Sequence, residues 1–334
     1  MTTQNRRIRW GVLGWARIAR ENVIPAVQRS KNSEFYAIAS RDTAKLAECR
    51  ARFPAVRTYP SYDELLRDGE VDAVYIPLPN SMHLEWTIKS AAQGKHVLCE
   101  KPIALNAVEC RELTAACAAN GVTLMEAFMY RYTDRTRKVL EVVRSGALGE
   151  IKFVSSTFRF LLANPASIKL KQELGGGSLY DVGCYPVNFV GMIADEIAGG
   201  GPGKGMIPQS VSVQLERTND IDVIFSALIK YPSGMIASLN CGFNAQKRVH
   251  SEIVGTRGAL EIPDTFFDNA GALTLVTGEE RREIPVEASD RYRLEVEDFA
   301  DAILEGREPM FKMSETQRNM EVLDRLLAAS ESKV

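Results

Sequence analysis

The chain has 334 residues, which at roughly 150 residues per domain suggests about two domains, and its 45% apolar and 25% charged residues are typical of a folded globular protein. Its 41 Lys and Arg nearly balance its 43 Asp and Glu, which argues against a nucleic-acid partner that needs a strongly basic surface. No apolar run approaches the ~20 residues that cross a bilayer, and the first residues show no apolar signal segment. We therefore expect a cytoplasmic protein with no membrane partner.

The six cysteines and three histidines give no sign of disulfides or of a metal site. No two cysteines form a C-x-x-C pair, and no two histidines have the spacing of helical metal ligands. Cys110 and Cys117 lie two helical turns apart, but the Ala and Leu around them indicate core packing. We therefore expect reduced, packed cysteines and no protein-bound metal.

Residues 1–130 alternate short apolar runs with helix-like segments, which is typical of a parallel sheet with crossover helices. The strands are continuous Val, Ile, Leu and Ala runs, as expected when both faces of a sheet are covered. The expected strands are Ile8–Leu13, Phe35–Ser40, Ala73–Pro77, His96–Cys99 and Val122–Phe128. The expected helices are Ala16–Arg29, Leu84–Gln93 and Ala107–Asn120.

The pattern changes near Gly149, where longer strands joined by hairpin-type turns begin. These strands are expected at Ile151–Phe160, Ser210–Glu216, Asp222–Lys230, Met235–Phe243, Val249–Val254 and Ala259–Ile262, and helices at about 178–197, 291–305 and 313–330. The sequence thus predicts an α/β fold in which residues 1–130 form a parallel-sheet domain. Residues 131–334 form an α+β domain with a large open, mostly antiparallel sheet, and its last helices pack on that sheet or back on the first domain.

The first expected strand ends in a turn that leads directly into a helix. Gly14, Ala16 and Ala19 occupy the three small-residue positions of the dinucleotide-binding fingerprint. Gly14 permits the tight turn, whereas Ala16 departs from the pattern where the backbone approaches the pyrophosphate. Trp15, beside this turn, either covers the cofactor or packs in the core. The residues expected to contact a dinucleotide here are Gly14, Trp15, Ala16, Arg17 and Ile18.

The end of the second expected strand favours NADP(H) over NAD(H). An NAD enzyme usually places an acidic residue there to bind the ribose 2′-hydroxyl. This chain instead has Ser40 and Arg41, with Lys45 one helical turn later, and these side chains suit a 2′-phosphate. Asp42 is expected to cap the following helix. The alternative is that Arg41 is only a solvated turn residue.

Glu100, Lys101 and Pro102 stand at the carboxyl end of a buried strand, where ligands of open α/β sheets bind. The proline restricts the lysine, and the bond between them is a candidate for the cis form. By itself, Lys101 is better explained as a solvated strand-end residue.

A second motif, residues 175–186, reads Gly-Gly-Gly-Ser-Leu-Tyr-Asp-Val-Gly-Cys-Tyr-Pro. With Glu100-Lys101-Pro102 it resembles the signatures of the glucose–fructose oxidoreductase/inositol dehydrogenase (Gfo/Idh/MocA) family, and the stretches 76–83 and 125–132 also look similar. The resemblance implies a Rossmann domain joined to an open-sheet domain, often paired sheet-to-sheet in homodimers or homotetramers. It also implies hydride transfer between nicotinamide C4 and a carbinol or carbonyl of a small cyclic sugar or polyol. Within the family, the second motif looks most like that of the aldose-oxidising group.

The resemblance places Tyr185 at the family's acid/base position. A free phenol titrates near 10, so Tyr185 needs a nearby cation, which Lys101 can supply. Asp181, one helical turn before Tyr185, would accept a sugar hydroxyl bond and help hold Lys101, or else cap a helix. Further expected cofactor contacts are Pro77, Leu78, Asn80, His83, Glu100 and Lys101. The expected substrate contacts are Lys101, Tyr130, Arg131, Asp181 and Tyr185.

An NADP-dependent sugar dehydrogenase or reductase is the preferred function, for example one that oxidises D-xylose or D-glucose to a lactone or reduces a keto-sugar. One alternative is a redox-assisted glycosidase that retains NAD. Such an enzyme would be expected to have the acidic second-strand residue that Ser40 and Arg41 replace. The other alternative is a non-catalytic NADP(H)-sensing regulator, which would not need to keep both Lys101 and Tyr185.

Overall fold

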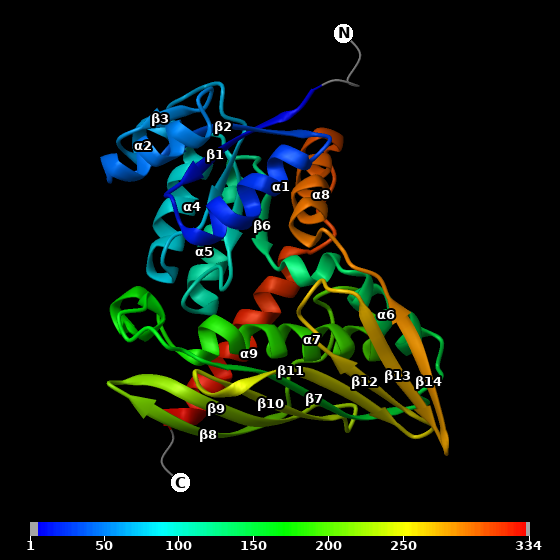
Figure 1. The fold of residues 1–334 in the computed structure, drawn as a ribbon. Coiled ribbons are helices and arrows are strands. Elements are labelled where there is room, and N and C mark those ends of the chain that lie inside the picture. The colour runs from blue at the N-terminus through cyan, green and yellow to red at the C-terminus, as the bar shows by residue number, and fades with distance from the viewer. Residues whose placement is uncertain (1–5, 332–334) are drawn as a thin grey trace. The chain divides into compact units, whose positions relative to one another are not determined.

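The computed structural model describes residues 6–331, which form two compact units (Figure 1). Unit one contains the described residues up to Ala104, together with Val108–Met129 and Asp290–Met313. Unit two contains Leu105–Ala107, Tyr130–Ser289 and the described residues from Ser314 onward. Both units are therefore discontinuous in sequence, which a single boundary at residue 130 does not express.

Unit one is built on a six-stranded sheet of order β3-β2-β1-β4-β5-β6, in which all neighbouring strands are parallel. Its strands are β1 (Ile8–Leu13), β2 (Ser33–Ala39), β3 (Arg57–Tyr59), β4 (Ala73–Ile76), β5 (His96–Glu100) and β6 (Leu124–Ala127). Every residue of β4 is buried, which explains the continuous apolar runs of the sequence. The five expected strands are confirmed to within a few residues, whereas the three-residue edge strand β3 was not predicted.

Helices connect these strands and complete the core of unit one. They are η2 (Ala19–Val23), α1 (Ile24–Arg29), α2 (Thr43–Arg52), α3 (Tyr62–Leu66), η3 (Asn80–Met82), α4 (His83–Ala92), α5 (Ala107–Ala119, less its first residue) and α8 (Arg291–Glu305). Although α8 comes late in the chain, it packs against α1, η2 and β2. Its Phe299 ring lies 5.5 Å from the ring of Trp10, centroid to centroid. The core of this unit therefore depends on a segment distant in sequence.

Unit two is built on an eight-stranded sheet of order β14-β13-β12-β11-β7-β10-β9-β8. Its strands are β7 (Ile151–Leu161), β8 (Ser210–Thr218), β9 (Ile221–Lys230), β10 (Ile236–Gly242), β11 (Asn244–Gly255), β12 (Ala259–Pro263), β13 (Gly271–Thr277) and β14 (Glu280–Val286). Only β7 and β10 pair in parallel, so the predicted mostly antiparallel sheet is confirmed. The strands β13 and β14 were not predicted.

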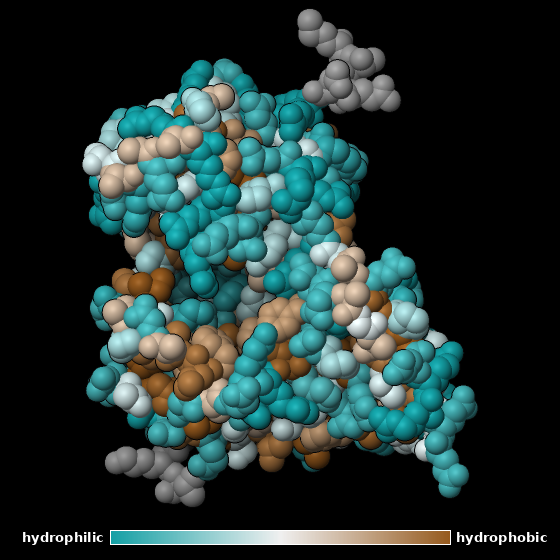
Figure 2. All heavy atoms as spheres, in the orientation of Figure 1, coloured by the Kyte–Doolittle hydropathy of each residue, from teal (hydrophilic) through white to brown (hydrophobic). Residues whose placement is uncertain are grey.

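One face of this sheet is covered by helices of the same unit. Its helices are η4 (Met129–Tyr132, less its first residue), α6 (Asp134–Arg144), η5 (Ile168–Leu170), η6 (Gln172–Leu174), η7 (Leu179–Gly183), α7 (Cys184–Ala198) and α9 (Met313–Glu331, less its first residue). Of these, α7 packs on β7 and β10, where inward side chains such as Val154 and Leu239 are buried. The side chains of the opposite face include Leu228, 55% exposed, and Ile236, 41% exposed. Figure 2 shows several apolar patches on the visible surface of unit two, in the lower part of the view.

The described residues contain free thiols, but neither a metal-binding cluster nor a membrane-spanning helix. All six cysteines are free thiols and are buried, as predicted. Among residues 6–331, no group of three or more His, Cys, Asp or Glu side chains is placed to hold a metal ion. No helix within the same range is both long and apolar enough to span a membrane.

Candidate active site

The turn after β1 has a backbone conformation that favours glycine. Gly14 has a φ of +100° and donates its N–H to the carbonyl of Ala39 at 2.8 Å. A Cβ at this position would lie 3.4 Å from Leu78 Cδ2 and 3.5 Å from the hydroxyl of Tyr62. The turns after β1 and β4 therefore lie against each other, at the sheet edge where nucleotides bind in such folds.

The side chains that follow Gly14 differ in exposure. Trp15 is 4% exposed and its ring stands edge-on to Phe53, with centroids 6.3 Å apart. This burial favours packing over a cofactor-covering role for Trp15. Ala16 and Ile18 are partly exposed and Arg17 is exposed, so this stretch remains open to a ligand.

The end of β2 presents cations and no acidic group for a ribose hydroxyl. Asp42 uses its carboxylate to cap α2 by accepting two backbone N–H bonds, at 3.0 and 3.3 Å, which confirms the predicted cap. Ser40 accepts the N–H of Asp42 at 3.1 Å, while Arg41 and Lys45 are exposed. Burial raises the pKa of Tyr62 and the charge of Arg41 partly offsets it, so Arg41 lies near the Gly14 turn. This donor set fits a 2′-phosphate.

The turn that carries Lys101 is held from two sides within unit one. The Lys101–Pro102 peptide bond is cis. The carbonyl of Pro102 lies 2.8 Å from His83 Nδ1, and the N–H of Ile103 donates to Glu126 Oε1 at 3.0 Å. His83 and Glu126 are both fully buried, so the position of the Lys101 backbone is strongly constrained.

His83 was predicted to contact the cofactor, and its surroundings favour a structural role instead. Its second ring nitrogen, Nε2, lies 2.9 Å from the carbonyl of Leu78, so both ring nitrogens face backbone carbonyls. Burial lowers the pKa of His83 to about 4, which makes the ring neutral at physiological pH. A neutral ring has one N–H and donates to one of these two carbonyls, which supports a positioning role for His83 between the turns after β4 and β5.

Glu100 contacts buried groups of unit one. Its Oε1 accepts the hydroxyl of Tyr75 at 2.5 Å. Glu295 of α8 is 1% exposed, and burial and the charge of Glu100 raise its pKa well above the usual range. These contacts favour a supporting role for Glu100 behind the Lys101 turn.

In unit two, the glycine motif is fixed by an acidic residue that sequence reasoning did not single out. Asp222 accepts the hydroxyl of Ser178 at 2.6 Å and the N–H of Leu179 at 2.8 Å, at the start of η7. Gly177 has a φ of +124°, and a Cβ there would collide with the carboxylate of Asp222. The only signal for Asp222 in the sequence was an acidic residue at the start of an expected strand.

Asp181 and Tyr185 lie on the continuous helical stretch formed by η7 and α7. The carboxylate of Asp181 lies 2.5 Å from Lys169 Nζ, an ion pair and not a helix cap. Tyr185 is 5% exposed, and its ring centroid lies 5.4 Å from that of Phe158 and 5.3 Å from that of Phe266. The structure thus gives the phenol an aromatic enclosure that local motifs did not reveal.

Tyr130 and Arg131, predicted to contact substrate, make internal contacts in unit two. The hydroxyl of Tyr130 donates to Asn188 Oδ1 at 2.6 Å. The guanidinium of Arg131 pairs with the buried carboxylate of Glu315 at 2.5 Å. These contacts favour structural roles for both residues.

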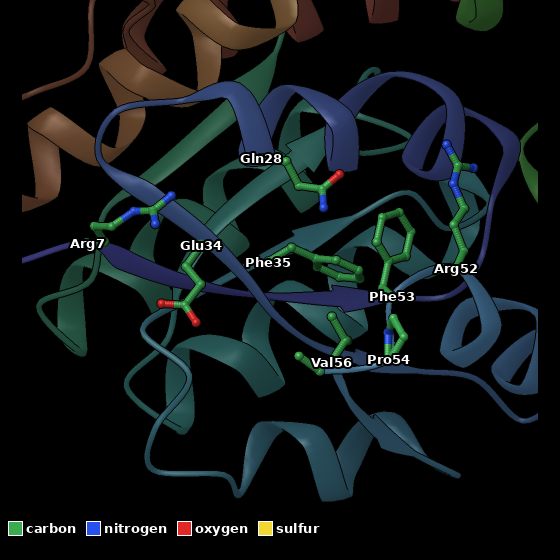
Figure 3. A pocket seen from close by; sticks show the side chains of 9 residues that line it. Arg7, Gln28, Glu34, Phe35, Arg52, Phe53, Pro54 and Val56 are labelled. Atoms are coloured by element: carbon green, nitrogen blue, oxygen red, sulfur yellow. The ribbon is translucent and has the colours of Figure 1, made fainter.

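A pocket of about 400 Å³ in unit one lies elsewhere (Figure 3). Its lining includes Phe35 and Phe53, which stand edge-on to each other, and the side chains of Arg7 and Arg52. Phe35 lies near the amino end of β2, whereas ligands of parallel sheets bind at the carboxyl ends. None of the predicted site residues lines this pocket, and we assign it no part in the site.

Comparisons with known proteins agree with this geometry. Residues 8–128 match the oxidoreductase family model with an NAD-binding Rossmann fold, and residues 136–261 match the GFO/IDH/MocA C-terminal domain. The chain is 36% identical over 329 residues to D-xylose 1-dehydrogenase (NADP(+)) 2 of Haloferax volcanii, with 97% of each chain covered. The chain belongs to the Gfo/Idh/MocA family.

Two further members of the family are similar along nearly the whole chain. An oxidoreductase of Rhizobium meliloti is 35% identical over 338 residues, with 97% of each chain covered. Among solved structures, a 3-ketoreductase from Actinomadura kijaniata in complex with NADP and TDP-benzene has a TM-score of 0.89 at 28% identity, covering 97% of this chain and 98% of that one. The predicted family and its two-part fold are thereby confirmed.

Proposed function

We propose that the protein is an NADP-dependent oxidoreductase that transfers hydride between nicotinamide C4 and a carbinol or carbonyl carbon of a small cyclic sugar or polyol. The observation that carries this proposal is that one chain retains Lys101 on a firmly held turn and Tyr185 in an aromatic enclosure. Relatives named as a xylose dehydrogenase and as a sugar 3-reductase support a carbohydrate substrate. Aldose oxidation to a lactone and keto-sugar reduction both fit this chemistry.

The residues present fit NADP(H). Gly14, Ala16, Arg17 and Ile18 would hold the pyrophosphate, and Ser40, Arg41 and Lys45 the 2′-phosphate, because Asp42 is engaged in capping α2. The residues that would line the nicotinamide side are Pro77, Leu78, Asn80 and Lys101. When bound, the nicotinamide supplies the hydride acceptor or donor. The relatives named as NADP-dependent or solved with NADP support this choice.

Tyr185 is the proposed acid/base. In oxidation it takes the proton of the substrate hydroxyl as hydride leaves the carbon, and in reduction it returns that proton. We assign the required cation to Lys101.

We further propose that two copies of the chain pair through the open face of the eight-stranded sheet. The exposed Leu228 and Ile236 lie on that face, on neighbouring strands. Exposed apolar side chains grouped on a flat surface are typical of an interface.

The test is an NADP+ reduction screen over D-xylose, D-glucose and inositols, with NADPH oxidation by keto-sugars in parallel. We expect turnover with at least one of these sugars, and Tyr185→Phe to lower kcat at least ~100-fold while NADPH binding is unchanged. Tyr36→Phe, a control on β2, should turn over like the wild type. Full turnover by Tyr185→Phe with normal cofactor binding would contradict the assignment.

A further inference from the structure

Lys169 pairs with Asp181, although the sequence motifs gave Lys169 no role. Its ammonium lies 2.5 Å from Asp181 Oδ2 and 5.2 Å from the ring centroid of Phe160. The side chain of Lys169 is 36% exposed and that of Asp181 is 18% exposed. A cation is therefore held at the edge of the helical stretch that carries Tyr185.

The position of Lys169 is built by the glycine motif. The N–H of Gly177 donates to the carbonyl of Lys169, and the N–H of Gly176 to that of Lys171, both at 2.9 Å. A Cβ at Gly176 would lie 2.5 Å from the carbonyl oxygen of Lys169, closer than real Cβ contacts allow. The glycines thus let the segment carrying Lys169 fold directly onto the start of η7.

The ion pair between Lys169 and Asp181 limits which hydrogen bonds each side chain can offer to a ligand. A carboxylate held by an ammonium at 2.5 Å is a hydrogen-bond acceptor with an engaged charge, so proton transfer remains with Tyr185. The ammonium has three N–H donors and gives one to Asp181. No second hydrogen bond of Lys169 Nζ occurs among residues 6–331, so donors are left for a ligand. The pair offers N–H donors on Lys169 and carboxylate acceptors on Asp181, which suits a polyhydroxyl compound.

We propose that Lys169 is a substrate-binding residue that holds Asp181 in place and donates a hydrogen bond to a hydroxyl or carbonyl oxygen of an uncharged sugar. The inference rests on the proposed function and adds a residue that determines substrate specificity. An exposed ion pair without function would contribute little to the stability of the fold, and any nearby lysine could form it. Lys171, exposed on the same segment, provides that comparison.

The test compares Lys169→Met with Lys171→Met and Lys169→Arg in the full-length enzyme. We expect Lys169→Met to raise the KM for the aldose at least ~10-fold, the loss expected for a hydrogen bond from a charged donor. For Lys169→Met, the KM for NADP+ and kcat should change less than ~3-fold. Lys171→Met should match the wild type. Lys169→Arg should have an aldose KM between those of the wild type and Lys169→Met. An unchanged aldose KM, or an equal rise in the KM for NADP+, would overturn the proposal.

A double-mutant cycle tests whether Lys169 and Asp181 act together. If they bind the sugar as one unit, Lys169→Met/Asp181→Asn should lose no more sugar affinity than the more damaging single variant. If the double variant instead loses sugar affinity by the product of the two single-variant factors, the claim that Lys169 holds Asp181 is overturned. Calorimetry of D-xylose or D-glucose binding to the NADPH-bound protein makes the same comparison without turnover. A wild type that binds these sugars but reduces no NADP+ would count against the proposed function alone.

Discussion

Arg41 carries the cofactor preference in the proposed function, because it is exposed at the end of β2 where no carboxylate is available. We predict that Arg41→Ala weakens NADPH binding by about 10- to 100-fold, the loss expected for a charge-assisted bond to phosphate, and leaves NADH binding unchanged. Titration of both cofactors by fluorescence measures this. Arg50→Ala, on the exposed side of α2, is the matched control. An equal loss for both cofactors would show that Arg41 does not contact the 2′-phosphate.

His83 makes stability depend on pH. Its pKa in the folded protein is lowered to about 4, whereas an unfolded histidine titrates near 6.5. Between these values the unfolded chain binds more protons, so stability rises from about pH 4 to pH 6.5 and levels off above. The difference corresponds to about 3 kcal/mol of unfolding free energy.

Urea unfolding at pH 4.5 and pH 7.5 measures this effect. We expect the wild type to lose most of that free energy at the lower pH, and His83→Gln, which cannot titrate, to show a smaller loss. The same loss in both proteins would assign the pH dependence to other groups. His250→Gln, at a half-exposed position on β11, is the control and should keep most of the wild-type slope.

Residues inside short motifs could be found from sequence, whereas those that act across the fold could not. Gly14, Asp42 and the Lys101 turn were predicted because their local patterns have a direct physical meaning. Lys169 could not be predicted, because its pairing with Asp181 depends on an irregular segment folding back on the glycine motif. Arg131 was predicted to contact substrate, but its partner Glu315 comes from a helix distant in sequence. This contact favours a structural role for Arg131.

At the scale of elements, α8 shows how much of unit one depends on a late segment of the chain. Phe299 is fully buried against Trp10 of β1. We predict that Phe299→Ala lowers the free energy of unfolding by about 3–5 kcal/mol, as for other large-to-small core substitutions. Urea unfolding of the NADPH-free protein measures it, with Val108→Ala at an exposed position of α5 as control. A loss below ~1 kcal/mol would mean that α8 is not part of this core.

Elements with a clear apolar period could be predicted, whereas some short or highly charged elements could not. The buried strands of unit one were found because continuous apolar runs are hard to explain otherwise. β3 is too short to show a pattern, and β14 carries charges on most of its residues, as edge strands often do. α6 was missed because most of its first residues are charged, although it buries Val139 and Val142.

At the scale of the whole molecule, the open face of the eight-stranded sheet predicts self-association. We expect the wild type to be a dimer or larger, and Leu228→Lys to shift it toward the monomer, because a charge would be buried between two sheets. Light scattering coupled to size-exclusion chromatography measures the mass. Val108→Lys, exposed on unit one, should leave the mass unchanged. A wild type that is monomeric at all concentrations would rule out this interface.

The close fit between Gly177 and Asp222 has a consequence for how this family diverges. A side chain at position 177 needs the space that the carboxylate at position 222 fills. A relative that gains a side chain at position 177 must therefore have a shorter residue at position 222. It must also change the backbone at position 177, because a φ of +124° itself favours glycine. Two positions far apart in the chain should thus covary across evolution, and libraries that randomise them jointly should recover combinations that single substitutions miss.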